Sequence, residues 1–293
     1  LIAASLDLSE HVKEVWGESR WRVLGSNISP SISVLAPAFN ERATINESVR
    51  SLLSLYYPGL EIVVVNDGSS DDTMAVLVQQ FDLAPYIPIY EKRIESKTIR
   101  GVFRSRNHPN LIVVDKDNGG KANALNAGLN LATGQLVCAI DADTLIEPDA
   151  MQRMVRPFLN RDDVVAADGT VRVANGCVVK SGRVIDARAP TSVVAGFQAI
   201  EYLQAFLFGR VGWNRMGGNM IISGAFGLFR RAAMIGVGGY AYDSVGEDME
   251  LIIRLRRRGH EQNGPRHRGR WAGSGTDGTA GSPTLCGVIA AFS

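Results

Sequence analysis

The chain is poor in cysteine and in net charge, and each deficit excludes a class of protein. Its 293 residues include three cysteines, which lie far apart and form no Cys-x-x-Cys pair. The sequence therefore predicts neither a zinc ribbon nor a disulfide framework, and it favours a reducing, cytosolic setting. Lysine and arginine number 31 against 30 aspartates and glutamates, a net charge of +1, so no overall field attracts nucleic acid or anionic lipid.

Long apolar runs are also missing. The longest uncharged stretch, residues 122–140, contains Asn, Thr, Gln and Gly, whereas a membrane-spanning helix needs about 20 predominantly apolar residues. We therefore expect no transmembrane helix in this sequence and no secretory signal at its beginning. Residues 1–30 are expected to be a lead-in to which we assign no function.

What is present is a regular alternation of apolar strands and short helices. Four apolar runs predict buried strands, at residues 31–36, 61–65, 111–114 and 136–140. Helical periodicity follows each run; Ile45 and Val49 share one helix face, behind a capping box of Thr44 and Glu47. This alternation predicts an α/β protein with a mostly parallel sheet and helices on both faces. Residues 82–110 are expected to be a long charged insertion.

Polar residues follow all four predicted strands. The four segments are 36–41, 66–72, 115–121 and 141–143, and between them they carry carboxylates, amides, a lysine and glycines. Any one of them alone is better explained as a turn. Because ligands bind outside the carboxyl ends of parallel strands, the four together predict a binding site at that edge of the sheet.

The chemistry of these segments suits a nucleotide diphosphate. Asp141 and Asp143 lie two residues apart, so in extended chain both carboxylates face one ligand and suit Mg²⁺ or Mn²⁺; a helix cap is the alternative interpretation. Lys121, after two glycines, suits a diphosphate contact, although a lone lysine is more often solvated surface. Asp67, at the end of a predicted strand, suits accepting hydrogen bonds from a nucleotide base or ribose. Neither a Gly-x-Gly-x-x-Gly fingerprint nor a P-loop is present, which favours a nucleotide bound through a metal.

Two segments of the second half are candidates for the acceptor side of the site. Gly246-Glu247-Asp248 precedes a helical pattern. Acidic residues are favoured at a helix N-terminus in any case, and a carboxylate there is also a natural general base. The segment 223–225, Ser-Gly-Ala, suits either an acceptor groove or a buried turn.

Taken in order, these motifs resemble the inverting family 2 glycosyltransferases with the GT-A fold, and in particular the processive bacterial β-glycan synthases. The resemblance covers roughly residues 30–262. It rests on six motifs in family order: Pro-Ala-Phe-Asn-Glu, Val-Asn-Asp-Gly-Ser-Ser-Asp-Asp-Thr, Asn-Gly-Gly-Lys, Asp-Ala-Asp, Ser-Gly-Ala and Gly-Glu-Asp.

The resemblance implies a role for each matching residue. The residues that it assigns to the nucleotide sugar are Pro37, Asn40, Glu41, Asp67, Lys121 and Asp141. It gives the divalent metal, Mg²⁺ or Mn²⁺, to Asp143 and the role of catalytic base to Asp248. The residues that it places beside the acceptor are Ser223, Gly224 and Glu247.

The implied reaction is transfer of a sugar, N-acetylglucosamine, from a UDP-sugar to a glycan acceptor, with inversion to a β-linkage, as in extracellular polysaccharide synthesis. The implied partners are the donor and the glycan, and the implied location is the cytoplasmic face of the cell membrane. Residues 193–208 are apolar enough to lie at a membrane interface, but burial in the core is the alternative that we favour. The chain alone is expected to be soluble.

The sequence departs from the family pattern after residue 262. Processive members carry a Gln-x-x-Arg-Trp motif there, and the only candidate here has His267 in place of Gln. We expect residues 31–262 to be the catalytic domain, cut from a longer membrane protein, and residues 263–293 to be a low-complexity tail that is not family sequence. The alternative function is a nucleotide-sugar-binding remnant that transfers poorly. A sugar-phosphate nucleotidyltransferase is disfavoured, because residues 36–41 lack its glycine-rich signature.

Overall fold

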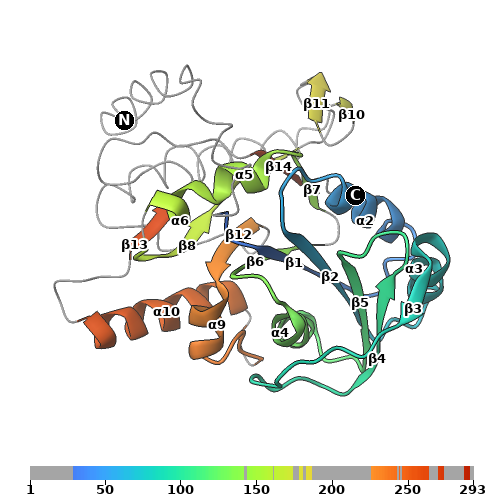
Figure 1. Cartoon of the computed structure of the whole chain (residues 1–293), viewed down its shortest axis with the longest axis horizontal. Coiled ribbons are helices and arrows are strands. Elements are labelled where there is room, and N and C mark those ends of the chain that lie inside the picture. Colours follow the sequence, from blue (N-terminus) through green and yellow to red (C-terminus); the bar gives the residue numbers. More distant parts are fainter. Residues whose placement is uncertain are drawn as a thin grey trace.

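The structure, a computed structural model, describes residues 29–141, 144–160, 162–173, 178–180, 183–186, 226–242, 244, 246–263, 270–273 and 287–290. A nine-stranded sheet forms its centre (Figure 1). In sheet order the strands are β13 (Arg270–Gly273), β8 (Val164–Asp168), β12 (Phe226–Arg230), β6 (Leu136–Ile140), β1 (Ile32–Ala38), β2 (Leu60–Asp67), β5 (Leu111–Lys116), β4 (Ile99–Ser105) and β3 (Leu83–Pro85).

The centre of the sheet is parallel and its flanks are mixed. Strands β6, β1, β2 and β5 run in the same direction. In contrast, β12 is antiparallel to β6 and β8, and β4 is antiparallel to β5 and β3. Two small sheets lie beside it, one of β10 (Val178–Lys180) and β11 (Arg183–Asp186), the other of β7 (Thr144–Ile146), β14 (Gly287–Ala290) and β9 (Thr170–Val173).

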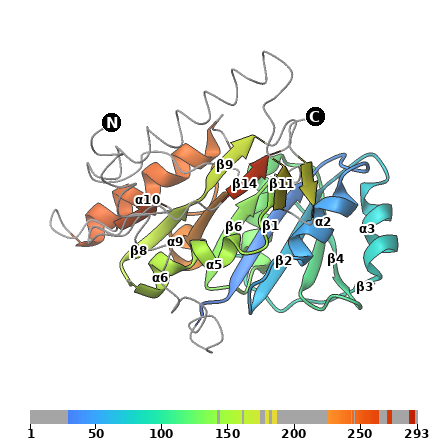
Figure 2. The same cartoon turned by 90° about the horizontal axis from the view of Figure 1, so that it is seen from above.

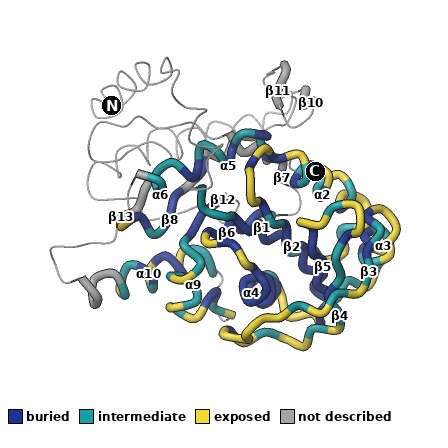
Figure 3. Tube along the Cα trace, viewed as in Figure 1, coloured by how far each residue is buried: buried dark blue, intermediate teal, exposed yellow. Residues whose placement is uncertain are grey.

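The four predicted strands are the four central ones. All five residues of β6 are buried, as are seven of the eight in β2, and the tube in Figure 3 is correspondingly dark along them. Continuous apolar runs belong to strands that are covered on both faces, because neither set of side chains then meets water. This is why the sequence pattern located these strands.

Helices cover both faces of the sheet, which confirms the predicted α/β class (Figure 1). Figure 2 looks onto the face that packs against α2 (Ile45–Leu53), α3 (Thr73–Phe81), α5 (Ala150–Met154) and α6 (Arg156–Asn160). The other packs against α4 (Lys121–Leu131), α9 (Arg231–Gly236) and α10 (Glu247–Asn263). Within the described ranges, no helix is both long enough and apolar enough to cross a membrane.

Two local predictions were wrong. Residues 82–110 are not only a charged insertion, since they contain the edge strand β3 and its neighbour β4. Strand β3 has only three residues, and the partly exposed positions of β4 include Arg100 and Arg104, so neither shows the apolar run of a central strand. The capping box also fails: the Thr44 hydroxyl donates to the Glu41 carboxylate at 2.6 Å and makes no cap bond to α2.

The tail predicted to have low complexity contains β13 and β14, and α10 ends at Asn263, one residue past the expected boundary. The domain limits stay a prediction. The expected lead-in up to residue 28 and the apolar segment 193–208 lie outside the described residues.

Helix α4 is buried on all sides and carries three asparagines that bind neighbouring loops. Every residue from Asn123 to Leu131 is buried, and a buried amide must find hydrogen-bond partners. The Asn126 amide accepts from the Tyr240 N–H and donates to the Tyr240 carbonyl, both at 2.8 Å. Asn130 accepts from the N–H of Ile94 and donates to its carbonyl. These bonds fix the loops around α4 and with them the position of its N-terminus.

We expect Asn126→Ala to lower the free energy of unfolding by about 2–4 kcal/mol, because it leaves a buried N–H and a buried carbonyl of Tyr240 without partners. Urea unfolding measures this. Asn46→Ala is the control, since Asn46 accepts an exposed bond from Arg50 on the surface of α2; its cost should be within about 0.5 kcal/mol. Equal losses in the two variants would contradict the assignment.

Candidate functional site

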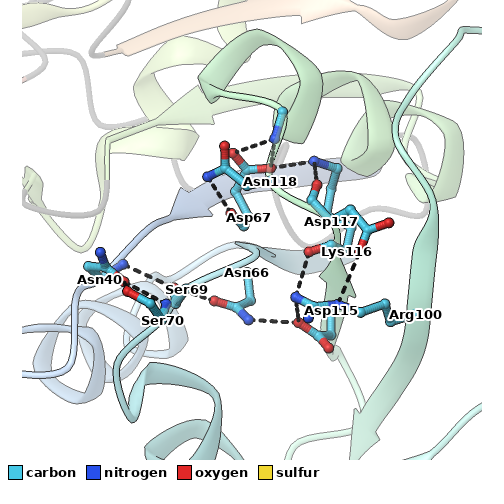
Figure 4. Close-up of polar contacts among 11 residues, drawn as sticks. Asn40, Asn66, Asp67, Ser69, Ser70, Arg100, Asp115, Lys116, Asp117 and Asn118 are labelled. Atoms are coloured by element: carbon cyan, nitrogen blue, oxygen red, sulfur yellow. Dashed lines mark hydrogen bonds and ion pairs between the residues drawn. The ribbon is translucent and has the colours of Figure 1, made fainter.

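The carboxyl ends of β1, β2, β5 and β6 meet at one edge of the sheet, here called the carboxyl rim. The loop after β1 is tied to the loop after β2: the Asn40 N–H donates to the Ser69 hydroxyl at 2.9 Å, and the Ser70 N–H donates to the Asn40 side-chain oxygen at 2.8 Å (Figure 4). Asn40 has φ 57°, a left-handed conformation that asparagine tolerates better than most residues. Its side chain thus holds two strand ends together.

Pro37 and Glu41 lie at the two ends of the same segment. Strand β6 pairs with β1 only from Ile32 to Leu35. At Pro37, β1 therefore has a partner on one side only, which makes a residue without an N–H acceptable there. The Glu41 N–H donates to the Thr73 hydroxyl at 2.9 Å, so the end of this segment is anchored to the start of α3.

Asp67 is the buried centre of the carboxyl rim. Its side chain is 4% exposed and forms an ion pair with the Lys116 ammonium. The N–H of Gly119 donates to its Oδ1 at 3.1 Å, and the N–H of Gly120 donates to its Oδ2 at 2.7 Å. The carboxylate therefore joins the end of β2 to the loop that leads into α4.

Lys121, the first residue of α4, lies among acidic groups. Its ammonium is 2.6 Å from Asp141 Oδ1, at the end of β6, and 3.9 Å from Glu247 Oε1, in the first turn of α10. Burial works to lower the pKa of Lys121, but the charge and hydrogen bond of Asp141, with the charges of Asp248 and Glu247, outweigh it and raise the pKa. Lys121 is thus a firmly held cation where three elements meet.

Asp248 has the most perturbed carboxylate of the site. Burial raises its pKa from 3.8 to about 6, and the negative charges of Glu247 and Asp141 add to this while Lys121 opposes it. A carboxylate with such a pKa is ionised at neutral pH and still basic enough to take a proton from a reacting hydroxyl.

The N-terminus of α10 is held in place by two other contacts. Arg254, on α10, donates to the Gly239 carbonyl at 2.6 Å and also to the Val237 carbonyl. The next residue, Tyr240, is the one bound by Asn126 of α4. The first turn of α10, with Glu247 and Asp248, is therefore linked to α4 through this short loop, which explains how a residue so late in the chain lies beside Lys121.

The structure brings together most of the predicted site residues. Asn40, Asp67, Lys121, Asp141, Glu247 and Asp248 lie along the carboxyl rim or next to it. Asp143, Ser223 and Gly224 fall outside the described residues, so the roles of the second aspartate and of the expected acceptor segment stay predictions.

Sequence reasoning missed Lys116, Asn126 and Tyr240. The signal for Lys116 was a lysine at the end of a buried strand, in register with Asp67 on the neighbouring strand. Tyr240 is fully buried, and burial raises its pKa. Asn126 had no signal in the sequence, because its partner lies more than a hundred residues away.

The carboxylates of this site have the oxygen chemistry that Mg²⁺ and Mn²⁺ prefer. Among the residues that the structure describes, however, no group of three or more His, Cys, Asp or Glu side chains could hold a metal ion. The carboxylate of Asp141 fits a ligand of such an ion, and the second aspartate of the pair, Asp143, would be needed to complete the site.

The family model of glycosyl transferase family 2 matches residues 33–236. The chain is similar to the poly-beta-1,6-N-acetyl-D-glucosamine synthase of Staphylococcus epidermidis, with 31% identity over 224 residues, 76% of this chain and 45% of that protein. It is also similar to the synthase of the same name in Staphylococcus aureus strain COL, with 29% identity over 232 residues, 78% of this chain and 46% of that protein. The chain thus spans less than half the length of these relatives.

Two solved structures share the fold. One is a mannosyltransferase from Pyrobaculum calidifontis in complex with GDP-Man and Mn²⁺, with a TM-score of 0.57, 19% identity, and coverage of 98% of this chain and 66% of that one. The other is S. aureus TarS 1–349 in complex with UDP-GlcNAc, with a TM-score of 0.53, 16% identity, and coverage of 90% and 59%. The expected GT-A fold is confirmed.

The raised pKa of Asp248 predicts that this residue destabilises the fold at neutral pH. A carboxyl whose pKa rises on folding binds its proton more tightly in the folded state, so stability falls as pH rises from about 4 to about 6. Asp248→Asn removes the buried charge and should raise the free energy of unfolding by about 1–2 kcal/mol at pH 7.5, with little gain at pH 4.

Urea unfolding at the two pH values measures this. The control is Asp162→Asn, an exposed carboxylate in the turn before β8. Strand β8 runs in the same direction as β6, because both are antiparallel to β12, so Asp162 lies at the opposite edge of the sheet. A gain for Asp248→Asn that is the same at both pH values would contradict the burial of its charge.

Proposed function

The chain belongs to glycosyl transferase family 2, and we propose that it transfers N-acetylglucosamine from UDP-N-acetylglucosamine to a hydroxyl of a glycan acceptor, with inversion to a β-linkage. The observation that carries the proposal is the carboxylate of Asp248, with a pKa of about 6, beside the cation of Lys121 at the carboxyl ends of the central strands. The choice of sugar is supported by the names of the curated relatives and by the donor bound to TarS.

On the donor side, Asp67 and the loop of Asn40 bind the uridine, and Lys121 neutralises the diphosphate. Asp67 accepts from Lys116 at Oδ1, from Gly120 at Oδ2 and from Gly119 at both oxygens. A carboxylate offers about four lone-pair positions, so a donor group of the nucleotide would replace the longest of these contacts, 3.3 Å from the Gly119 N–H to Oδ2. The Lys121 ammonium lies one residue beyond these glycines, so base and diphosphate would be bound by neighbouring parts of one loop.

The chemical step in this proposal is a single displacement. Asp248 removes the proton of the acceptor hydroxyl, whose oxygen attacks the anomeric carbon from the face opposite the diphosphate. The bond from that carbon to the diphosphate oxygen breaks, and UDP leaves with the electron pair. One displacement inverts the anomeric centre, so an α-linked donor yields a β-linked product. Ser223, Gly224 and Glu247 are proposed to lie beside the acceptor.

A bound Mg²⁺ or Mn²⁺ would act as a Lewis acid that neutralises charge on the departing diphosphate. We propose that Asp143 binds this ion and that Asp141, next to Lys121, contacts the nucleotide. The Mn²⁺ complex of the mannosyltransferase supports a divalent cation in a protein of this fold. The cytoplasmic face of the cell membrane stays the predicted location.

A second candidate function is binding of the nucleotide sugar without efficient transfer. It is favoured by the residues after 262, which lack the Gln-x-x-Arg-Trp motif expected from the resemblance. The two functions share the donor site and differ only in turnover. Titration with UDP by calorimetry, followed by an assay of UDP release from UDP-N-acetylglucosamine with a chito-oligosaccharide acceptor, separates them.

We expect Asp248→Asn to reduce transfer by about 10²–10⁴-fold, which is the usual contribution of a general base, while the Kd for UDP changes less than about threefold. In the unaltered chain, kcat/KM should fall as the pH drops through about 6, where Asp248 becomes protonated. Asp162→Asn should leave the rate and its pH profile unchanged. Substantial transfer by Asp248→Asn would remove this residue from the mechanism.

Removal of divalent cations should abolish transfer. Dialysis against EDTA is expected to reduce UDP release to background, and added Mn²⁺ or Mg²⁺ should restore it, whereas Ca²⁺ at the same ionic strength should restore it less because it accepts looser geometry. Full activity in EDTA would rule out the metal-assisted reaction.

A further inference from the structure

Lys116 is a buried lysine at the end of β5 to which the proposed reaction assigns no role. Its side chain is 0% exposed, and lysine is almost never fully buried unless it is paired. Its ammonium donates to Asp67 Oδ1 and to the Asp117 carbonyl (Figure 4). Because desolvation of an ammonium is costly, the buried Lys116 depends on the Asp67 carboxylate as its counter-charge.

The pair with Lys116 also affects the hydrogen bonds that Asp67 accepts from the loop after β5. An ionised carboxylate accepts hydrogen bonds from backbone N–H groups more strongly than a neutral carboxyl. Asp67 accepts from Gly119 and from Gly120, at 3.1 Å and 2.7 Å, and the Asn118 amide donates to the Asp67 carbonyl at 2.8 Å. Three consecutive residues of this loop are therefore bound to one aspartate.

The geometry of the loop transmits this anchoring to Lys121. Gly120 has φ 84°, and a Cβ at Gly119 would lie 2.6 Å from the Asn123 side chain, so the backbone is tightly placed between Asp67 and α4. Lys121 follows directly and begins the helix. Once the two glycine amides are fixed, the starting point of the Lys121 side chain is fixed as well.

We propose that Lys116 is a positioning residue for donor binding: through the Asp67 carboxylate it holds the Gly119 and Gly120 amides and so places Lys121 to meet the diphosphate. The inference rests on the proposed function for its ligand, and it adds a residue that touches neither the nucleotide nor the acceptor. A positioning residue of this kind affects the affinity for the donor. An ion pair that only stabilises the sheet, as any ion pair near a strand end could, does not.

Arg100 offers a matched control. It lies on β4 and binds the same end of β5, where its guanidinium is 3.1 Å from the Asp115 carboxylate and donates to the Lys116 carbonyl at 2.7 Å. Unlike Lys116, it makes no contact with Asp67 in the described structure. Arg100→Met and Lys116→Met each remove one cation from this strand end, but only the second removes the partner of Asp67.

The experiment compares the two variants in the full chain by calorimetric titration with UDP in the presence of Mn²⁺. Lys116→Met is expected to raise the Kd for UDP about tenfold or more, and Arg100→Met less than about twofold. Hydrogen exchange of the peptide that contains Gly119 and Gly120 should accelerate in Lys116→Met and stay unchanged in Arg100→Met. Both are measured well below the unfolding temperature of each variant.

If Lys116→Met alone does not fold, the double variant Lys116→Met/Asp67→Asn replaces it in the test. Replacing both partners leaves no unpaired buried charge. The Kd of the double variant for UDP should be within about twofold of that of Asp67→Asn, because the proposal routes the effect of Lys116 on Lys121 through Asp67 and gives its second bond, to the Asp117 carbonyl, no part in donor binding. A double variant that binds UDP clearly more weakly than Asp67→Asn would overturn the inference.

The remaining outcomes separate this inference from the proposed function. If the unaltered chain binds UDP and Lys116→Met binds it equally well, the positioning role is wrong and the proposed function stands. If the unaltered chain fails to bind UDP, the proposed function is wrong, and with it the link to donor affinity. The exchange rates of Gly119 and Gly120 then still decide whether Lys116 anchors the loop.

Discussion

The ammonium of Lys121 is the point on which the site depends. Three carboxylates from distant parts of the chain interact with this one cation: Asp141 at the end of β6, and Glu247 and Asp248 in the first turn of α10. Without a cation between them, these negative charges would repel each other in a partly buried space. Much of the surrounding structure can be understood as what is needed to keep Lys121 in place.

Helix α4 keeps Lys121 in place because it is buried on all sides, whereas most helices have one solvated face. Its asparagines bind the backbone of the loops that enclose it, so burial leaves these amides paired. The same device joins α4 to the loop before α10 through Tyr240, while Arg254 binds that loop from the other side. The relative position of Lys121 and Asp248 is thus set by the buried hydrogen bonds of Asn126 and by the partly buried ones of Arg254.

The site also shows a conflict between stability and chemistry. A half-buried carboxylate with a raised pKa is unfavourable for the fold at neutral pH, yet it is the protonation behaviour that a general base requires. The buried pair of Lys116 and Asp67 is another case, since two buried charges are a weak source of stability. Its value is more easily explained by the geometry that it imposes on the loop after β5.

Much of the fold and of the site followed from the sequence, because both depend on local patterns. Continuous apolar runs marked the central strands, and the polar residues at their ends marked the carboxyl rim. The strand β4 and the edge strand β3 were missed because β3 is short and the partly exposed positions of β4 interrupt its apolar pattern. The Thr44 capping box was wrong because the Thr44 hydroxyl bonds to the Glu41 carboxylate and accepts no hydrogen bond from an N–H of α2.

The remaining features depend on contacts between segments far apart in the sequence. The bonds of Asn126 with Tyr240 join residues that no periodicity connects. The ion pair of Lys116 with Asp67 requires the register of two strands. The raised pKa of Asp248 depends on the burial that α10 acquires only after packing. Sequence patterns located the carboxylate, and the fold supplied the environment that makes it basic.

A crystal structure of this chain with UDP and Mn²⁺ would show directly whether a nucleotide diphosphate binds at the carboxyl rim. We expect diphosphate oxygens within hydrogen-bond distance of the Lys121 ammonium, with the uracil between the loops that follow β1 and β2. UDP bound at any other surface of the chain, with Lys121 still paired to Asp141 and Glu247, would contradict this expectation.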